Sequence, residues 1–180
     1  MRIAAKPLCE YPWFVRLFFW KQKRTYGQVL DPGLLWGRAP LVFAGVALLY
    51  GALNRKSSPL DGALRSLVTV RISQINHCSF CIDVNTKTLM DRGASMEKVE
   101  ALAQWRGCPL FDAAERAALE YAEAVTYSDR GVDGALFARV KDIFGGDGVV
   151  ELTGLIAFQN MSSKFNAALD VPPQGFCKIS

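Results

Sequence analysis

Apolar residues recur every three or four positions through most of the chain after residue 60. This spacing is typical of the buried face of an α-helix. Leu64, Leu67, Val68, Ile72 and Ile75 follow it without interruption. No segment alternates apolar and polar residues for long enough to form a sheet. The pattern therefore predicts an all-α fold.

Helix signals divide this part of the chain into six helices. Short polar residues that favour N-caps precede five of them, at Asp61, Ser95, Asp112, Asp133 and Asp147. We expect helices over residues 61–75, 78–93, 95–105, 112–127, 133–144 and 147–169. The glycines at 145, 146 and 148 follow a helix and precede no Lys-Ser/Thr pair, so they predict a turn between helices rather than a phosphate-binding loop.

The first 54 residues have a different character. Ten of the 20 aromatic residues lie within the first 50, and prolines at 12, 32 and 40 divide the segment into short helices and turns. We expect residues 1–54 to form a helical extension packed on the rest of the domain or on a neighbouring subunit; a lid over an active site is the alternative. Residues 55–180 would form the main helical domain.

Composition and charge restrict the class of protein. With 51% hydrophobic and 21% charged residues, the chain is expected to fold as one domain. The net charge of +4 is scattered, which argues against a nucleic-acid partner. The uncharged run from Leu41 to Leu53 is shorter than the roughly 20 residues of a membrane span. No secretory leader is evident, so we expect a cytoplasmic protein with reduced thiols.

The most informative motif is the Cys78-Ser79-Phe80-Cys81 segment at a predicted helix start. Residues three apart share a helix face, so the two sulfurs can approach each other, and the helix N-terminus favours a thiolate. Asn85 extends the same stripe one turn further. Dithiol redox chemistry is the favoured interpretation of this stripe.

Two other interpretations of the cysteine pair remain. Zinc would need two more ligands, and the chain has no second CxxC and no histidine pair. The thiols could also be inert at a buried helix end. The other cysteines, Cys9, Cys108 and Cys177, lack paired spacing and are expected to pack as small apolar residues. Cys177, near the end of the chain, is a candidate auxiliary thiol.

His77 is the only histidine and directly precedes the cysteine pair. It follows Ser66 by eleven residues, almost three helical turns. The two side chains would therefore share one face if the preceding helix is continuous.

Three segments carry a resemblance to a known family. The run LVTVRISQINHCSFCID at 67–83 resembles the signature helix pair of the carboxymuconolactone decarboxylase and alkylhydroperoxidase D superfamily. AALEYAEAVT at 117–126 is similar to the helix that follows, and NMSSKFN at 160–166 resembles a peroxidase-related branch. The resemblance covers about residues 55 to 170 and leaves the aromatic N-terminal segment outside.

The resemblance implies an AhpD-like helical bundle that assembles as a trimer or hexamer. It also implies thiol-dependent peroxide reduction, in which Cys81 attacks the peroxide and Cys78 resolves the intermediate. The substrate would be a peroxide or disulfide, with an external thiol as electron donor and no metal or other cofactor. The residues alone do not distinguish the attacking sulfur, because both lie at the helix terminus.

The chain departs from the family pattern at two positions. The family has Glu where this chain has Ser66, and His where it has Asn85. Neither replacement titrates near neutral pH, so the proton relay that activates the thiol is missing. His77 or an acid from a neighbouring helix could stand in, and peroxidase activity is expected to be weak. The alternatives are a cofactor-free decarboxylase acting on a lactone acid, and a non-catalytic oligomeric protein.

Overall fold

The computed structural model describes residues 1–177, and every regular element among them is a helix. In chain order these are η1 (Leu8–Glu10), α1 (Trp13–Tyr26), α2 (Asp31–Trp36), α3 (Pro40–Leu53), α4 (Gly62–Ile75), α5 (Ser79–Asp91), α6 (Met96–Ala101), η2 (Leu102–Gly107), α7 (Ala113–Thr126) and α8 (Gly134–Ala168). The all-α prediction is confirmed. Within the described residues, none of these helices has the length and hydropathy needed to cross a bilayer.

The predicted N-caps hold at most helix starts. The Asp61 carboxylate accepts hydrogen bonds from the first turn of α4. Asp112 and Glu115 form a complete capping box at the start of α7. Ser95 and Asp133 cap α6 and α8 in the same way. These short side chains satisfy backbone N–H groups that the first helical turn leaves without partners.

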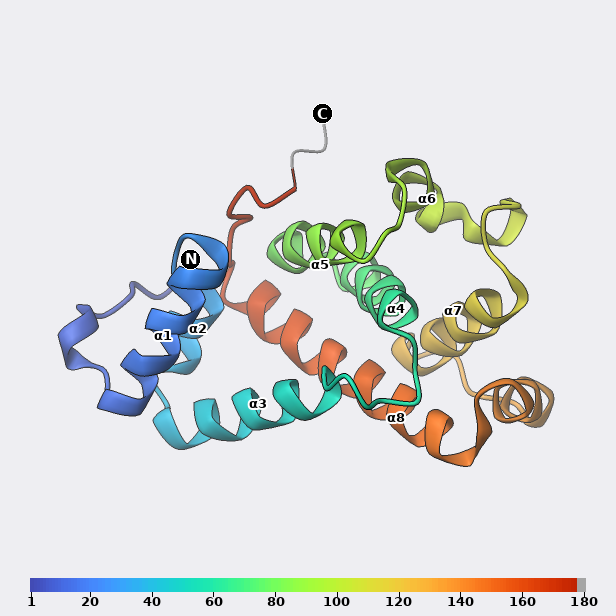
Figure 1. Ribbon diagram of the computed structural model, residues 1–180, viewed down its shortest axis with the longest axis horizontal. Helices are drawn as coiled ribbons and strands as arrows, with labels where there is room; N and C mark the ends of the chain where they lie inside the picture. Colours follow the sequence, from blue (N-terminus) through green and yellow to red (C-terminus); the bar gives the residue numbers. More distant parts are fainter. Residues whose placement is uncertain (178–180) are drawn as a thin grey trace.

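Three predicted helices differ in extent from those in the structure. The segment expected to be helical over 95–105 is α6 followed by the 3₁₀ helix η2, because Gln104 leaves the helical conformation at φ −121°. The two helices expected around the glycine turn form one element, α8, with a sharp break at Gly145 (Figure 1). Gly145 has φ +69°, a conformation that glycine adopts without steric cost.

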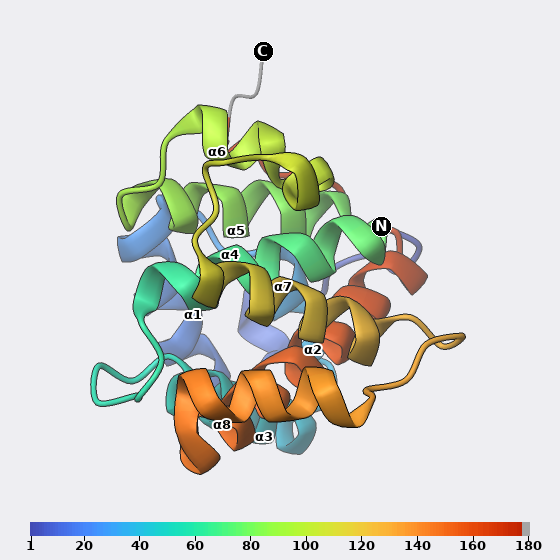
Figure 2. The same cartoon turned by 90° about the vertical axis from the view of Figure 1, so that its right-hand side faces the viewer.

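Helix α4 lies at the centre of the domain and is buried on nearly all sides. Leu64, Val68 and Ile72 pack against α7 and α8, whereas Leu67 and Val70 pack against α5, η2 and α7. In Figure 2 the helices follow one another from top to bottom in the order α5, α4, α7 and α8. Because α4 contacts α5, α7 and α8, its position determines where α5 begins.

The carboxylate of Glu123 on α7 is buried among three arginines. Arg71 and Arg106 each approach it to 2.7 Å and Arg130 to 3.5 Å, and the indole N–H of Trp105 donates to it at 2.9 Å. Burial by itself would raise the pKa of Glu123, but hydrogen bonds from Trp105, Arg106 and Arg71 outweigh burial and hold the pKa below its usual value. The cluster joins α4, η2 and α7.

The N-terminal segment lies on the opposite side of the molecule from α7, against α8 and α5 of the same chain (Figure 1). The Trp36 ring stacks on Phe165 of α8 with centroids 3.6 Å apart. Leu35 of α2 belongs to the same apolar cluster as the two cysteines of the CxxC motif. Sequence reasoning left open whether this segment covers its own domain or a neighbour, and here it covers its own.

The C-terminal residues hold this N-terminal segment against α5. Asp83 of α5 accepts backbone hydrogen bonds from Gln174, Gly175 and Cys177, at 2.6–2.8 Å. The Gln174 side chain in turn accepts from the backbone N–H of Asp31 at 2.8 Å. The side chain of one buried aspartate therefore fixes the tail, and the tail fixes the start of α2.

The Glu123 cluster predicts a pH-dependent stability. The folded-state pKa is lowered, so the carboxylate contributes stability above its unfolded pKa of about 4.3 and loses it as the pH falls further. We expect Glu123→Gln to lower the free energy of unfolding at pH 7 by about 3 kcal/mol, because the arginines lose their buried partner. Urea denaturation of both proteins at pH 7 and pH 3 measures this difference, which should shrink at pH 3.

Glu120→Gln is the matched control on the same helix. Glu120 is an exposed partner of Arg139, and an exposed pair contributes no more than about 1 kcal/mol. Equal losses of stability in the two variants would contradict the assignment of Glu123 as the buried link.

Candidate active site

The turn between α4 and α5 places the cysteine pair. His77 has φ +51°, which reverses the chain direction, and the backbone N–H of Cys78 then donates to the Ser73 carbonyl at 3.1 Å. Cys78 is the N-cap of α5, and its sulfur accepts from the Cys81 N–H at 3.3 Å. Cys78 and Cys81 are joined as a disulfide, with Cα atoms 5.2 Å apart. Both residues are buried.

His77 does not reach the site. His77 would share a face with Ser66 only on a continuous helix, and this condition is not met, because α4 ends at Ile75 and His77 has a left-handed backbone. The imidazole is exposed and does not line the cavity beside Cys81. The geometry therefore gives no support to a role as the base.

Ser66 is also distant from the cysteines. It is buried near the start of α4 and accepts a hydrogen bond from Arg92 at 2.8 Å, at the far end of α5. Helices α4 and α5 run antiparallel, so Ser66 lies beside the end of α5 and Ser73 lies beside its beginning. The structure brings together Cys78, Cys81 and Asn85, and leaves Ser66 and His77 outside.

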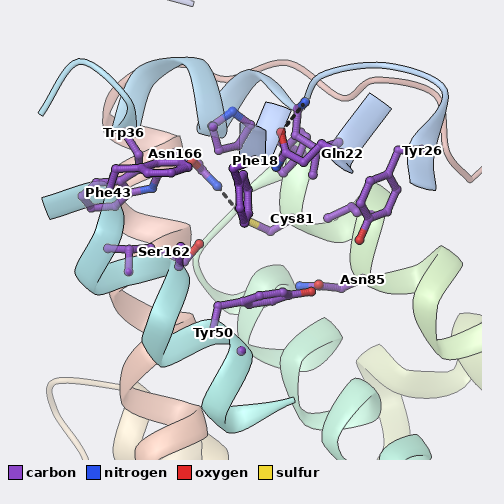
Figure 3. A pocket seen from close by; sticks show the side chains of 18 of the residues that line it. Phe18, Gln22, Tyr26, Trp36, Phe43, Tyr50, Cys81, Asn85, Ser162 and Asn166 are labelled. Carbon is purple, nitrogen blue, oxygen red and sulfur yellow. Dashed lines mark hydrogen bonds between the residues drawn. The ribbon is translucent and has the colours of Figure 1, made fainter. Parts of the chain in front are cut away.

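A cavity of about 420 Å³ opens over Cys81 (Figure 3). Its walls come from both parts of the chain: α1, α2 and α3 on one side, α5 and α8 on the other. Cys81 lines the cavity, whereas Cys78 lies behind it. The dithiol can thus meet a small molecule only through Cys81 in this arrangement.

The cavity wall is aromatic and almost uncharged. Its large side chains include Phe18, Trp36, Phe43, Phe80 and Phe158. Lys21, an exposed residue of α1, is the only charged residue among the lining positions of the described chain. An acid that could replace the missing base was one expectation from the sequence, and no carboxylate or imidazole lines this wall.

The polar side of the cavity is built around the hydroxyl of Ser73. Ser73 Oγ donates to the Thr69 carbonyl at 2.6 Å and accepts from Asn85 Nδ2 at 3.1 Å and from Gln159 Nε2 at 3.0 Å. Gln159 Nε2 donates a second hydrogen bond, to Ser163 Oγ at 2.8 Å. Asn85, expected on the cysteine stripe, is held in place by this network.

Asn166 of α8 contacts the sulfur of Cys81. It is 2% exposed, and its Nδ2 donates to Cys81 Sγ at 3.2 Å (Figure 3). A donor at this position stabilises a thiolate more than a thiol, because the thiolate carries the negative charge. Asn166 and the helix N-terminus of α5 would both stabilise a thiolate at Cys81.

Two tyrosines complete the wall opposite the cysteine. In Figure 3 the rings of Tyr26 and Tyr50 point their hydroxyl ends toward Asn85. About half of the Tyr50 surface is exposed, but its hydroxyl lies inside the cavity. Burial of the hydroxyl and the neighbouring Tyr26 raise the pKa of Tyr50 to about 12. Tyr50 stays protonated at neutral pH and can donate a hydrogen bond into the cavity.

Sequence reasoning missed four of these residues: Tyr26, Tyr50, Gln159 and Asn166. A signal existed for two of them, because Gln159 and Asn166 are polar residues seven positions apart, about two helical turns, and therefore share one face of α8. The tyrosines lie in the N-terminal segment and share no spacing with the cysteines. Only the packing of α1 and α3 over α5 brings them to the site.

The remaining cysteines lie elsewhere. Cys177 sits beside Asp83 and Met90, and burial followed by the nearby Asp83 carboxylate raises the pKa of its thiol. Cys9 and Cys108 line no part of the cavity. Among the described residues, no group of three or more histidine, cysteine or acidic side chains is arranged to hold a metal ion.

The contact between Asn166 and Cys81 makes a testable prediction. Replacing Asn166 by Leu removes the donor, and a hydrogen bond to a charged group contributes about 1.5–3 kcal/mol. At 1.36 kcal/mol per unit, we expect the pKa of the Cys81 thiol in the reduced protein to rise by about one to two units. The pH dependence of iodoacetamide alkylation measures it. Ser162→Ala, on the same helix and cavity wall, is the control that should leave the pKa unchanged.

The chain is similar in sequence to a known family and to two bacterial proteins. The carboxymuconolactone decarboxylase family matches residues 40–124. The chain is 45% identical to the protein YnjA of Escherichia coli K12 over 173 residues, which covers 96% of this chain and 95% of YnjA. It is 30% identical to YdfG of Bacillus subtilis 168 over 115 residues, covering 63% of this chain and 78% of YdfG.

Solved structures share nearly the whole arrangement. A peroxidase-related protein of Ralstonia eutropha JMP134, with an alkylhydroperoxidase AhpD core, superposes with a TM-score of 0.87 at 20% identity, over 96% of this chain and 92% of its own. That coverage includes most of the aromatic N-terminal segment, which sequence reasoning placed outside the resemblance. The chain belongs to the carboxymuconolactone decarboxylase family and has the helical fold of the AhpD core.

Proposed function

We propose that this protein is a thiol-dependent peroxidase that cycles between the Cys78, Cys81 dithiol and its disulfide. The Cys81 thiolate attacks one oxygen of a peroxide, the O–O bond breaks, and the leaving oxygen takes a proton to form an alcohol or water. Cys81 becomes a sulfenic acid. The Cys78 thiol then displaces water from it and forms the disulfide, which an external dithiol reduces by two electrons.

The observation that carries the proposal is the unequal access of the two sulfurs. Cys81 lines the cavity and accepts a hydrogen bond from Asn166, whereas Cys78 lies behind it as the N-cap of α5. The accessible sulfur suits the attacking role, and the covered sulfur suits the resolving role. The cycle needs a reducing compartment, so we propose the cytoplasm as its location.

The composition of the cavity supports a slow enzyme. A positioned general base accelerates proton transfer by about 10²–10⁴-fold. Among the described residues, the polar side chains that face this cavity are neutral amides and hydroxyls, apart from Cys81 and the exposed Lys21. The helix terminus and Asn166 lower the thiol pKa but remove no proton from it. The decarboxylase alternative is less well supported, because a lactone acid would bring a carboxylate to a wall with a single peripheral cation.

The two cysteines should respond differently to mutation. We expect Cys81→Ser to abolish peroxide consumption and Cys78→Ser to stop the cycle at a Cys81 sulfenic acid, which dimedone labels. The measurements are stopped-flow rates with the reduced protein and mass spectrometry of the labelled peptide. His77→Ala is the control, expected to react at the wild-type rate because the imidazole lies outside the cavity. Labelling of Cys78 in the Cys81→Ser variant would reverse the assigned roles.

We also propose that copies of this chain associate. Large apolar side chains are exposed on the outer faces of α1 and α3, among them Trp13, Leu17, Leu41 and Leu48. A lone domain rarely leaves so much apolar surface in water. We expect sedimentation at micromolar concentration to give a species larger than the 19.8 kDa chain, and Leu48→Glu to shift it toward monomer. A wild-type monomer would contradict this.

A further inference from the structure

The hydrogen bonds of Ser73 determine which way two amides face. The Ser73 hydroxyl donates its single proton to the Thr69 carbonyl, so it can only accept hydrogen bonds from other groups. Asn85 and Gln159 must therefore present their NH₂ ends to it. Their carbonyl oxygens point elsewhere, and no donor among the described residues bonds to either oxygen.

Both carbonyl oxygens belong to residues that line the cavity. Gln159 is 6% exposed, so its oxygen has little access to bulk water. Asn85 lies one helical turn beyond Cys81 on α5. Among the described residues that line the cavity, the acceptor that is fully buried without a partner is Asn166 Oδ1. The oxygens of Asn85 and Gln159 are not enclosed in this way, so each can accept a hydrogen bond from a molecule in the cavity. These two oxygens therefore favour a ligand that donates hydrogen bonds close to the sulfur of Cys81.

The remaining wall selects for an apolar ring. Trp36 is fixed in orientation by its stack on Phe165, and Tyr50 packs against Phe158 with centroids 6.1 Å apart. A volume of about 420 Å³ lies within the range of small-molecule sites. Aromatic walls of this kind contact flat rings over a large apolar area.

The charge of the wall excludes ionised ligands. Among the described residues, no carboxylate lines it to pair with a cation, and the one cation that does, Lys21, is exposed on α1. Moving an unpaired charge out of water is strongly unfavourable. The ligand should therefore be neutral.

We propose that the cavity over Cys81 binds a neutral aromatic molecule that donates a hydrogen bond to the carbonyl oxygens of Asn85 and Gln159. Its ring lies among Trp36, Phe43 and Phe158. The claim that such a molecule is the substrate rests on the proposed function, in which it would carry the O–O bond that Cys81 attacks. As a binding site, it stands on the cavity alone.

Three naphthalenes test the proposal by isothermal titration calorimetry. 1-Naphthol donates a hydrogen bond, 1-methoxynaphthalene has the same ring without the donor, and 1-naphthoate carries a charge. The protein is used in its disulfide form, so that no thiolate or peroxide chemistry takes part. We expect 1-naphthol to bind about tenfold more tightly than 1-methoxynaphthalene, the effect of one buried hydrogen bond. We expect 1-naphthoate to bind more weakly than either.

Variants separate the two parts of the site. Gln159→Met keeps the length of the side chain and should reduce the preference for 1-naphthol; Asn85→Leu serves the same purpose if Gln159→Met does not fold. Trp36→Ala should weaken both neutral ligands. Trp13→Ala is the matched control, because Trp13 is 76% exposed on α1 and lines no part of the cavity.

Three results would overturn the proposal: equal affinity for 1-naphthol and 1-methoxynaphthalene, tighter binding of 1-naphthoate, or no binding of any naphthalene. Failure of the peroxide experiments together with the expected affinities would refute the peroxidase function and leave the binding site intact. Successful peroxide experiments together with one of the three contrary binding results would refute the ligand class and leave the peroxidase function intact.

Discussion

The turn between α4 and α5 is the constraint on which the site depends. Its geometry is maintained by a backbone hydrogen bond from Cys78 to Ser73 and by the left-handed residue His77 between the helices. Because α4 is packed on nearly all sides, the turn has little freedom to move. The N-terminus of α5, and both sulfurs with it, are consequently fixed relative to α8, where Asn166 meets Cys81.

A second constraint comes from the ends of the chain. The N-terminal helices form the aromatic wall, and the carboxylate of Asp83 holds the C-terminal tail that in turn contacts the start of α2. Asp83 lies two residues beyond Cys81 on α5, so its side chain is on the other side of the helix from the cavity. One short helix therefore carries the cavity-facing sulfur of Cys81 on one side and the anchor for the covering segment on the other.

The replacements at the family positions are physically consistent with each other. A buried carboxylate or imidazolium in this aromatic cavity would need a charged partner, and the described wall offers only Lys21 at its edge. Neutral amides avoid that requirement, and Ser73 satisfies the NH₂ groups of both. At the other family position, Ser66 is occupied with Arg92, far from the cysteines. The polar side of the cavity is therefore built from neutral side chains that Ser73 holds in place.

The sequence by itself determined the helical class, most helix starts, and the stripe of Cys78, Cys81 and Asn85, because all of these follow from local spacing and capping chemistry along one helix. It did not determine the direction of His77, since a single left-handed residue breaks the helical register and leaves no periodic trace. Only the tertiary structure decided which sulfur is accessible and which side chains face it. Tyr26, Tyr50 and Asn166 are separated from Cys81 by 31 to 85 residues. Their approach depends on how whole helices pack, and helix packing is determined by the shape of the assembled core rather than by any short segment.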